Sequence, residues 1–261
     1  PPFAGASRFS GQAAPGTFAS GGPVLNAPPV ARPALPPIWV LALAVSGANV
    51  GISILSPAIP DMRASLMATA DEAQLVLGAF MVMLGLGQLG AGTLSDRIGR
   101  RPVLVYGSLL FTLSGLGAMM ATSVELLIAM RVLQGAGAAA CMAMGRVIVN
   151  DSFSRDEAGR QLSTITMFQA VVPILGFAFG GMLADFVGWR GAVAVMVATA
   201  AVVLLATIFL LRETRLEKSS PMPVGRMIGV YVRLLGTPKF ISNAGAAALL
   251  TAAFFAMGGF M

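Results

Sequence analysis

The sequence predicts an all-α membrane protein, and three observations carry this prediction. Of its 261 residues, 56% are hydrophobic and only 11% are charged, whereas a soluble domain carries roughly 25% charged residues. The apolar residues gather in stretches that match the length of about 20 residues that a helix needs to cross a bilayer. The Lys and Arg residues concentrate in alternate loops between these stretches. A water-soluble globule is therefore not expected.

The helices expected from these stretches are seven in number. Residues 1–37 are rich in Pro, Gly, Ala and Ser, which predicts a disordered cytoplasmic tail. Residues 38–211 predict a six-helix bundle, residues 212–239 a cytoplasmic linker with six Lys or Arg residues, and residues 240–261 a seventh transmembrane helix. The fourth span is interrupted by Arg131, and the other spans are free of Asp, Glu, Lys and Arg. In chain order the seven spans are 38–60, 73–95, 102–124, 125–146, 161–184, 191–211 and 240–261.

The basic residues predict the orientation, because basic loops stay on the cytoplasmic side. Thirteen Lys or Arg residues lie on one side, counting the tail and the linker, and only Arg63 and Arg190 lie on the other. We therefore expect the N-terminus to be cytoplasmic and the first span to be an uncleaved anchor. Trp39 and Trp189 fall at the ends of two spans, where indoles favour the headgroup region, although packing inside the protein would also explain them.

The composition excludes several kinds of active site. The chain has no His, so it can form neither a Ser-His or Cys-His catalytic pair nor a His-dependent zinc site. Its single cysteine, Cys141, cannot close an intramolecular disulfide. A net charge of +6 would suggest nucleic acid as a partner of a soluble protein, but in a membrane protein it indicates basic loops. We expect no enzyme activity, no metal site and no nucleic-acid partner.

Two loops form an internal repeat. The segments 92–101 and 181–190 have five identical residues at a constant offset of 89. Because three spans separate the two copies, they must lie on opposite faces of the membrane. The bundle is thus expected to consist of two inverted three-helix repeats, although chance similarity of short Gly-rich loops is the alternative. Many secondary transporters build two access states around one midplane site from such repeats.

Several motifs resemble the major facilitator superfamily, and the chain is identified as a member on that basis. The segment 92–101 is similar to the signature loop between the second and third helices of the family, and the segment 131–137 to its fourth-helix motif. Arg146 with Asp151, the glycines of the fifth span and the segment 188–190 resemble the Bcr/CflA type of drug/proton antiporter. The resemblance implies that the six helices form one half of a two-half bundle. Because the chain begins without Met and stops within the seventh span, we expect the C-terminal half to be missing.

The signature loop is interpreted as a conformational gate. Asp96 can accept charge-assisted hydrogen bonds from arginine or from the N–H groups of a helix N-terminus. Such bonds would latch the cytoplasmic side closed, the role that the resemblance implies, whereas the arginines also serve as ordinary topology signals. The predicted gate residues are Gly92, Asp96, Arg97, Gly99, Arg100 and Arg101.

A second set of residues is assigned to the substrate or proton pathway. An arginine inside a span costs about 2.5 to 3.5 kcal/mol, so Arg131 should face the bundle interior and have a partner. The resemblance implies that it takes part in proton coupling, and snorkelling to the interface is the alternative, which is the simpler explanation for Arg146. Ser53 stands where related antiporters carry an acidic residue, which puts proton coupling in doubt. The predicted pathway residues are Asn49, Ser53, Arg131, Gln134 and Arg146.

Small residues in two spans are assigned to helix packing. The antiporter motif of the fifth span places Pro173, Gly176, Gly180 and Gly181 in this class, with Phe177 where the motif has proline. The segment 85–90 has the spacing of a dinucleotide-binding loop, but it lies inside an apolar span without a preceding strand. We interpret its glycines as surfaces for close helix approach.

The predicted function is secondary transport across the bacterial inner membrane. By resemblance it is proton-coupled efflux of drugs or other small amphiphilic molecules through alternating access, with no cofactor and the proton gradient as energy source. The expected partners are the lipid bilayer, a small-molecule substrate, protons and the missing C-terminal half. A metabolite symporter or uniporter of the same superfamily is one alternative, favoured by the missing first-span carboxylate. The other is a non-transporting membrane scaffold or sensor, against which Arg131 argues.

Overall fold

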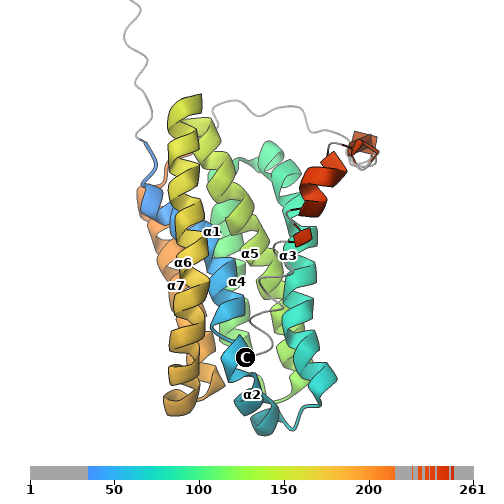
Figure 1. The fold of residues 1–261 in the computed structure, drawn as a ribbon. Coiled ribbons are helices and arrows are strands. Elements are labelled where there is room, and N and C mark those ends of the chain that lie inside the picture. The colour runs from blue at the N-terminus through green and yellow to red at the C-terminus, as the bar shows by residue number, and fades with distance from the viewer. Residues whose placement is uncertain are drawn as a thin grey trace, which may run out of the picture. The chain divides into compact units, whose positions relative to one another are not determined.

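The computed structural model describes residues 35–214, 225, 229–230, 233–234, 236–238, 240–246 and 248–249. Every regular element that it describes is helical. α1, η1 and α2 together make the first of six stretches long and apolar enough to span a membrane, and α3 to α7 make one each. The all-α membrane fold is confirmed. The elements are α1 (Ile38–Ser53), the 3-10 helix η1 (Ser56–Ala58), α2 (Ile59–Leu66), α3 (Ala70–Ile98), α4 (Arg100–Met119), α5 (Val124–Ser152), α6 (Arg155–Val187) and α7 (Trp189–Leu210) (Figure 1).

Three predicted segments fall wholly or partly outside the described residues. The tail is described only from residue 35, and the linker only in part after residue 214. Residues 240–246 and 248–249 of the predicted seventh span are helical. The remainder of that span lies outside the described residues, so its length stays a prediction.

The first span is interrupted, where the sequence suggested one continuous helix. α1 ends at Ser53, and the chain continues through η1 into α2. Pro57 and Pro60 occupy the second positions of η1 and α2, where a missing backbone N–H is tolerated because the N–H would have no helical acceptor. The two prolines therefore divide the span into short helices.

Several helices are longer than the charge-free stretches from which they were predicted. α3 begins at a capping box in which the Thr69 N–H donates to Glu72 at 2.8 Å, and α6 begins at the same motif formed by Ser154 and Glu157. Capping boxes satisfy the first N–H groups of a helix. The polar first turns therefore remain helical, and α3 and α6 reach 29 and 33 residues.

The bundle is packed around α5 and α1. α5 contacts α1, α3 and α4, and α7 contacts α1 and α4. We call the end with the α3–α4 and α5–α6 junctions the basic end, and the other the opposite end. One apolar core cluster, with Leu41, Leu104 and Ile148, lies toward the basic end, and the other, with Leu55 and Trp189, toward the opposite end.

The two tryptophans differ in environment. Trp189 is 1% exposed and belongs to the core of the opposite end, whereas Trp39 is 48% exposed. The headgroup interpretation therefore does not apply to Trp189, because its ring packs inside the protein.

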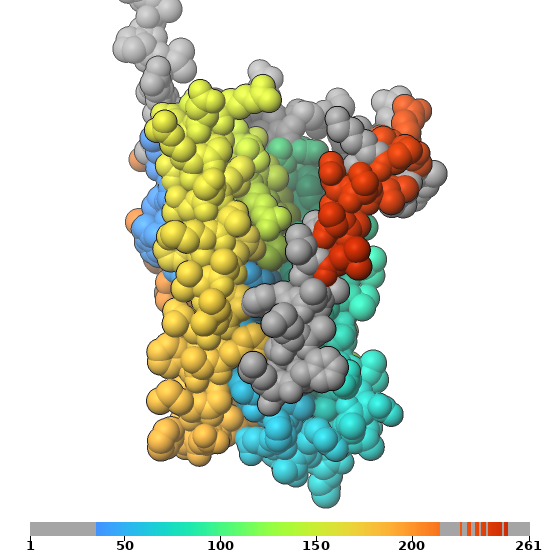
Figure 2. Space-filling model, in the orientation of Figure 1, coloured from blue at the N-terminus to red at the C-terminus, as the bar shows by residue number. Residues whose placement is uncertain are grey.

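α3 and α6 are the least covered helices. Only 17% of the most apolar window of each is buried, compared with 72% for the first span. Both form much of the face seen in Figure 2, α6 in yellow and α3 in cyan to green. Large apolar side chains are exposed along them, including Leu75, Val82 and Leu86 of α3 and Phe168, Ile174 and Phe179 of α6. These faces can meet lipid or another protein segment.

Candidate functional site

The junction between α3 and α4 is a single residue, Gly99. Its φ of 105° lies in the left-handed region, which glycine adopts without steric cost. The chain thus turns directly from one helix into the next, which brings Asp96 of α3 next to Arg100 of α4. Arg97 is exposed on the same turn, and Gly92 lies one turn earlier with open space where a Cβ would be.

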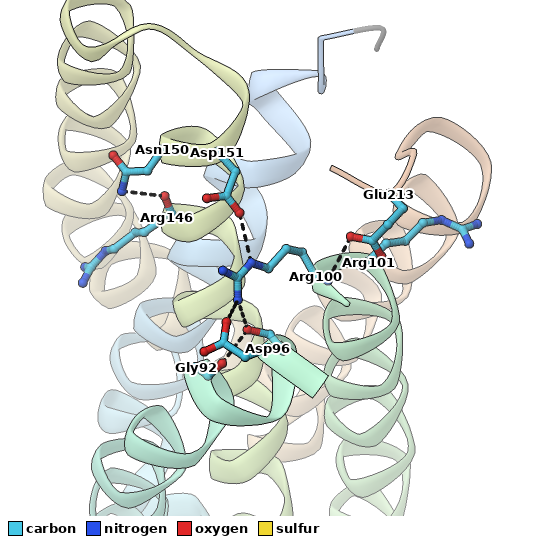
Figure 3. A network of polar contacts seen from close by, with 9 residues as sticks. Gly92, Asp96, Arg100, Arg101, Arg146, Asn150, Asp151 and Glu213 are labelled. Atoms are coloured by element: carbon cyan, nitrogen blue, oxygen red, sulfur yellow. Dashed lines mark hydrogen bonds and ion pairs between the residues drawn. The ribbon is translucent and has the colours of Figure 1, made fainter. Parts of the chain in front are cut away.

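Arg100 connects three helices (Figure 3). Its Nη1 donates to Asp96 Oδ1 at 2.9 Å and to the Ser95 hydroxyl, and its Nε donates to Asp151 Oδ2 of α5 at 3.0 Å. The Arg100 side chain is 13% exposed, against 45% for Asp96 and 33% for Asp151. Two carboxylates therefore share one largely shielded guanidinium, a stronger arrangement than an isolated surface ion pair.

Glu213, which the sequence analysis did not single out, completes this network. It follows α7 closely, and its Oε1 and Oε2 accept the backbone N–H groups of Arg100 and Arg101 at 3.0 and 3.2 Å. Gly99 has no side chain with which to cap α4, so these N–H groups need another acceptor. A carboxylate is also favoured at the positive end of the helix dipole. The only sequence signal was an acidic residue among the basic residues of the linker.

An arginine–carbonyl contact between α4 and α7 occurs at both ends of the bundle, with the donor and acceptor helices exchanged. Arg101 at the start of α4 donates to the carbonyl of Ile208 near the end of α7 at 2.8 Å. Arg190 at the start of α7 donates to the carbonyl of Met119 at the end of α4 at 3.0 Å. Arg190 and Ile208 stand 89 residues after Arg101 and Met119, so the two contacts are equivalent under the repeat. The α3–α4 and α6–α7 junctions, which carry the two copies of the repeat, lie at opposite ends of the bundle (Figure 1). The inverted repeat is therefore confirmed.

The equivalence stops at the position of Arg100. Its counterpart Trp189 is buried, and the Trp189 backbone N–H donates to Asp61 Oδ2 of α2 at 2.7 Å. Arg190 lies over the Trp189 ring, 4.4 Å from its centroid. An aromatic ring thus takes the place of the bridging guanidinium, and within the part of the chain that the structure describes the carboxylate–arginine network lies at the basic end.

Arg131 is fully buried, with 0% of its surface exposed. Its Nη2 donates to the Gly51 carbonyl at 2.9 Å, its Nη1 to Gln134 Oε1 at 2.6 Å, and its Nε to the Val76 carbonyl at 3.4 Å. Its guanidinium also stacks over the Phe80 ring, 4.2 Å from the centroid. Gly51 lies in the last turn of α1, where carbonyls lack helical donors. Arg131 therefore caps the interrupted first span, and the structure contradicts the snorkelling alternative.

Asn49 satisfies a carbonyl that a proline leaves without a donor. Pro173 has no N–H, so the carbonyl of Gln169, four residues earlier in α6, receives no helical hydrogen bond. Asn49 Nδ2 of α1 donates to this carbonyl at 3.3 Å. The Gln169 side chain in turn accepts a hydrogen bond from Arg146 Nη2 of α5 at 3.1 Å. Asn49, Arg146 and Gln169 form what we call the polar cluster.

The polar cluster brings together two predicted pathway residues through one that was missed. Gln169 could have been noticed as a polar residue four positions before a proline inside a span. Nothing in the sequence, however, indicates that Asn49 and Arg146 meet on it, because the three residues come from different helices.

The glycines of α6 lie against the first span. A Cβ at Gly176 would come within 2.9 Å of Ser53 Cβ, and one at Gly180 within 2.9 Å of Pro57 Cγ, whereas Gly181 has only an ordinary 4.0 Å contact. Ser53 is 0% exposed and donates to a carbonyl of its own helix at 2.7 Å. Ser53 is thus part of the α1–α6 packing contact, and in this structure its hydroxyl is not open to a substrate.

Packing explains only one of the closely spaced glycines of α3. A Cβ at Gly87 would come within 2.7 Å of Ala139 Cβ on α5, but Gly85 and Gly90 have nothing within 4 Å. Gly85 and Gly90 lie on the uncovered side of α3, where no described helix packs, so for them the interpretation of this segment as a close helix contact stays a prediction.

A cavity of about 820 Å³ opens toward the opposite end, between the first span, α3 and α6. Its lining is mainly apolar and includes Ile52, Leu77 and Phe177, with Arg63 and Gln74 as polar members. No member of the polar cluster lines it, and neither does Arg131.

Comparison with known proteins gives consistent matches over most of the chain. The profile of the Major Facilitator Superfamily matches residues 41–261. Multidrug resistance protein D of Escherichia coli (strain K12) is 31% identical over 203 residues, 78% of this chain and 51% of that protein. The uncharacterized MFS-type transporter YdgK of Bacillus subtilis (strain 168) is 33% identical over 221 residues, 84% of this chain and 54% of that protein.

Two further matches are shorter or more distant. The chloramphenicol resistance protein of Pseudomonas aeruginosa is 37% identical over 144 residues, 55% of this chain and 34% of that protein. The crystal structure of the human organic anion transporter MFSD10 (TETRAN) has a TM-score of 0.55 and 23% identity, and covers 71% of this chain and 49% of that one. The chain thus spans about half the length, or less, of the relatives it matches. From its profile match and its inverted-repeat fold, the chain belongs to the Major Facilitator Superfamily, a family of membrane transporters and not of enzymes.

Proposed function

We propose that this chain is part of a secondary transporter that exports small amphiphilic molecules across the bacterial inner membrane. Two relatives support export, since one is named a chloramphenicol resistance protein and another a multidrug resistance protein. Alternating access around a midplane site is the mechanism that suits a bundle of inverted repeats. The proton gradient supplies the energy in this proposal, and no cofactor is required.

The observation that carries the proposal is the Arg100 network at the basic end. Arg100 and Glu213 hold the ends of α3, α4 and α5 and the segment after α7 in one arrangement. The Asp96 carboxylate at its centre is 45% exposed, so a second half of the transporter has access to it. A charged network with accessible carboxylates can form and break as a gate, whereas the buried Trp189 occupies the equivalent position at the opposite end.

A second half is part of this proposal. The chain spans 51% and 54% of two relatives, and α3 and α6 leave long apolar faces uncovered. In a two-half transporter the substrate site lies between the halves. We therefore expect the 261 residues alone to insert into a membrane without transporting.

Proton coupling needs a titrating group that the interior of the six spans does not supply. Their Asp and Glu residues lie only near helix ends, and Ser53 stands in place of the antiporter carboxylate. The proton carrier is therefore proposed to lie outside these spans. Because of this observation, a metabolite symporter or uniporter of the same superfamily is the second candidate.

The proposed orientation places the basic end in the cytoplasm, because basic loops stay on that side. Met67 is 92% exposed at the opposite end, and Asp156 is exposed at the basic end. In intact cells, an impermeant maleimide is expected to label Met67→Cys but not Asp156→Cys. Cys141 is buried and gives little background. Labelling of Asp156→Cys alone would reverse the orientation.

Export is tested by expressing the protein from its natural gene in an efflux-deficient bacterium. We expect lower ethidium accumulation than in the empty host, with the difference lost after an uncoupler collapses the proton gradient. The 261-residue chain alone is the matched control and should accumulate dye like the empty host. Equal accumulation with and without the natural protein, at confirmed membrane expression, would contradict export. A difference that survives the uncoupler would contradict proton coupling.

A further inference from the structure

The Arg146 side chain extends into the membrane-spanning region, and not toward the basic end. Arg146 lies six residues before the end of α5 at Ser152, which is about 9 Å along the axis. Helical side chains tilt toward the helix N-terminus, and for α5 this direction leads to the opposite end. Its partner Gln169 lies 14 residues after the start of α6 at Arg155, about 21 Å inward. The 3.1 Å contact to Gln169 thus draws the guanidinium inward, which contradicts the snorkelling expectation.

The structure gives this guanidinium no carboxylate among the described residues. The next acid on α5 is Asp151, five residues on and turned by about 140° around the helix. Asp151 pairs with Arg100 at 3.0 Å, and Figure 3 shows the Arg146 side chain directed away from both. Arginine carries five N–H donors, and the one hydrogen bond described for this side chain goes to a neutral amide.

Gln169 presents further donors beside the guanidinium. Because Arg146 can only donate, the Gln169 amide must turn its oxygen to it, and the Nε2 group on the same carbon then carries two more N–H donors. Asn49 holds the Gln169 backbone at 3.3 Å through the carbonyl that Pro173 leaves free. Arg146 is exposed and Gln169 is half-buried. The cluster is therefore an ordered set of donors that a ligand can reach.

The positive charge within the six spans favours binding of an anion at the polar cluster. Between their polar ends, the six spans carry Arg131 and Arg146 and no Asp or Glu. The Arg131 donors already bind carbonyl and amide oxygens in a fully buried position. Arg146 is therefore the accessible positive charge of this interior, and an uncompensated charge in a span is costly.

We infer that Arg146 and Gln169 bind a carboxylate, with the guanidinium as the ionic partner and the Gln169 amide as a second donor. Within the proposed export function, on which this inference rests for the source of the ligand, the carboxylate belongs to the transported molecule. The same chemistry is supplied by an acidic side chain of another part of the protein, and the experiment separates the two sources.

The test uses two dyes that share a xanthene core and differ in charge. The natural gene product is placed in lipid nanodiscs, and binding of fluorescein, an anion, and rhodamine 6G, a cation, is followed by anisotropy. Loss of a charge-assisted hydrogen bond should raise the Kd of fluorescein about tenfold or more in Arg146→Gln, while the Kd of rhodamine 6G stays within about twofold. Arg146→Lys should keep part of the fluorescein affinity, and Gln169→Ala should lose a smaller part. Arg160→Gln, which removes an exposed charge elsewhere on α6, is the matched control.

Each outcome decides the inference. Selective loss of fluorescein affinity assigns the carboxylate to the ligand. If Arg146→Gln does not distinguish the two dyes and its Tm lies clearly below that of Arg160→Gln, the carboxylate is assigned to an acidic side chain of the protein. Unchanged dye affinity and unchanged Tm would overturn the site, and so would an equal loss of both dyes at unchanged Tm. Because binding is measured without transport, failure of the export assay leaves this result intact and overturns only the proposed function.

Discussion

Replacing Arg131 with alanine is expected to abolish transport and to lower the stability of the bundle by about 3 kcal/mol or more. The substitution removes the donor to the Gly51 carbonyl at 2.9 Å and the bond to Gln134 at 2.6 Å. It also leaves a void beside Phe80, because the Arg131 side chain is completely enclosed. Without this cap the C-terminal end of α1 loses its hydrogen bond to α5. Substrate export in cells and the Tm of the purified protein measure the two effects.

Two further variants separate charge from geometry at this position. Arg131→Lys keeps the positive charge but cannot reach both oxygens with a planar fork, so it should retain part of the stability and part of the transport. Arg155→Ala removes an exposed arginine from the start of α6 and should change neither. Normal transport and a normal Tm in Arg131→Ala would show that the first span needs no cap. Arg131 would then no longer be assigned to the candidate site.

Replacing Arg100 with alanine is expected to reduce transport more than about tenfold, because it removes the shared partner of two carboxylates. Asp96 and Asp151 accept from it at 2.9 and 3.0 Å, and without it their charges repel each other across the α3–α5 contact. The basic end should then stay open. Transport rates in membrane vesicles, together with maleimide labelling of a cysteine at Gly85 on the uncovered side of α3, measure this change.

The controls for Arg100 distinguish a gate from a topology signal. Arg100→Lys preserves the basic charge that sets orientation but supplies one ammonium in place of a fork that reaches two carboxylates, so it should insert normally and still transport poorly. Glu213→Gln keeps a hydrogen-bond acceptor at the start of α4 and should lose less activity than Glu213→Ala. If Arg100→Lys transports at the normal rate and leaves the labelling unchanged, the network serves orientation only.

The sequence by itself determined the class of the protein and its internal symmetry. Apolar stretches of membrane-spanning length predict seven helices, since a lipid-embedded backbone must satisfy its hydrogen bonds within each helix. The part of the chain that the structure describes contains the first six as complete candidate spans. The offset of 89 between the two loops predicts an inverted repeat, which the exchanged contacts of Arg101 and Arg190 confirm. Such features are local or periodic along the chain, so they are readable without a structure.

Only the tertiary structure decided what the polar residues of the bundle contact. Apart from Gln134 on the same helix, the carbonyls that Arg131 binds, the partner of Arg146 and the acceptor at the start of α4 come from segments 23 to 113 residues away along the chain. Spacing within one helix contains no information about these contacts. Carbonyls left free by a helix end or by Pro173 become visible as acceptors only after the helices are packed, because a donor on a neighbouring helix must then satisfy them in an environment without water. For this reason Ser53 was assigned to the pathway although it packs against α6, and Glu213 and Gln169 were missed although they hold the two polar arrangements together.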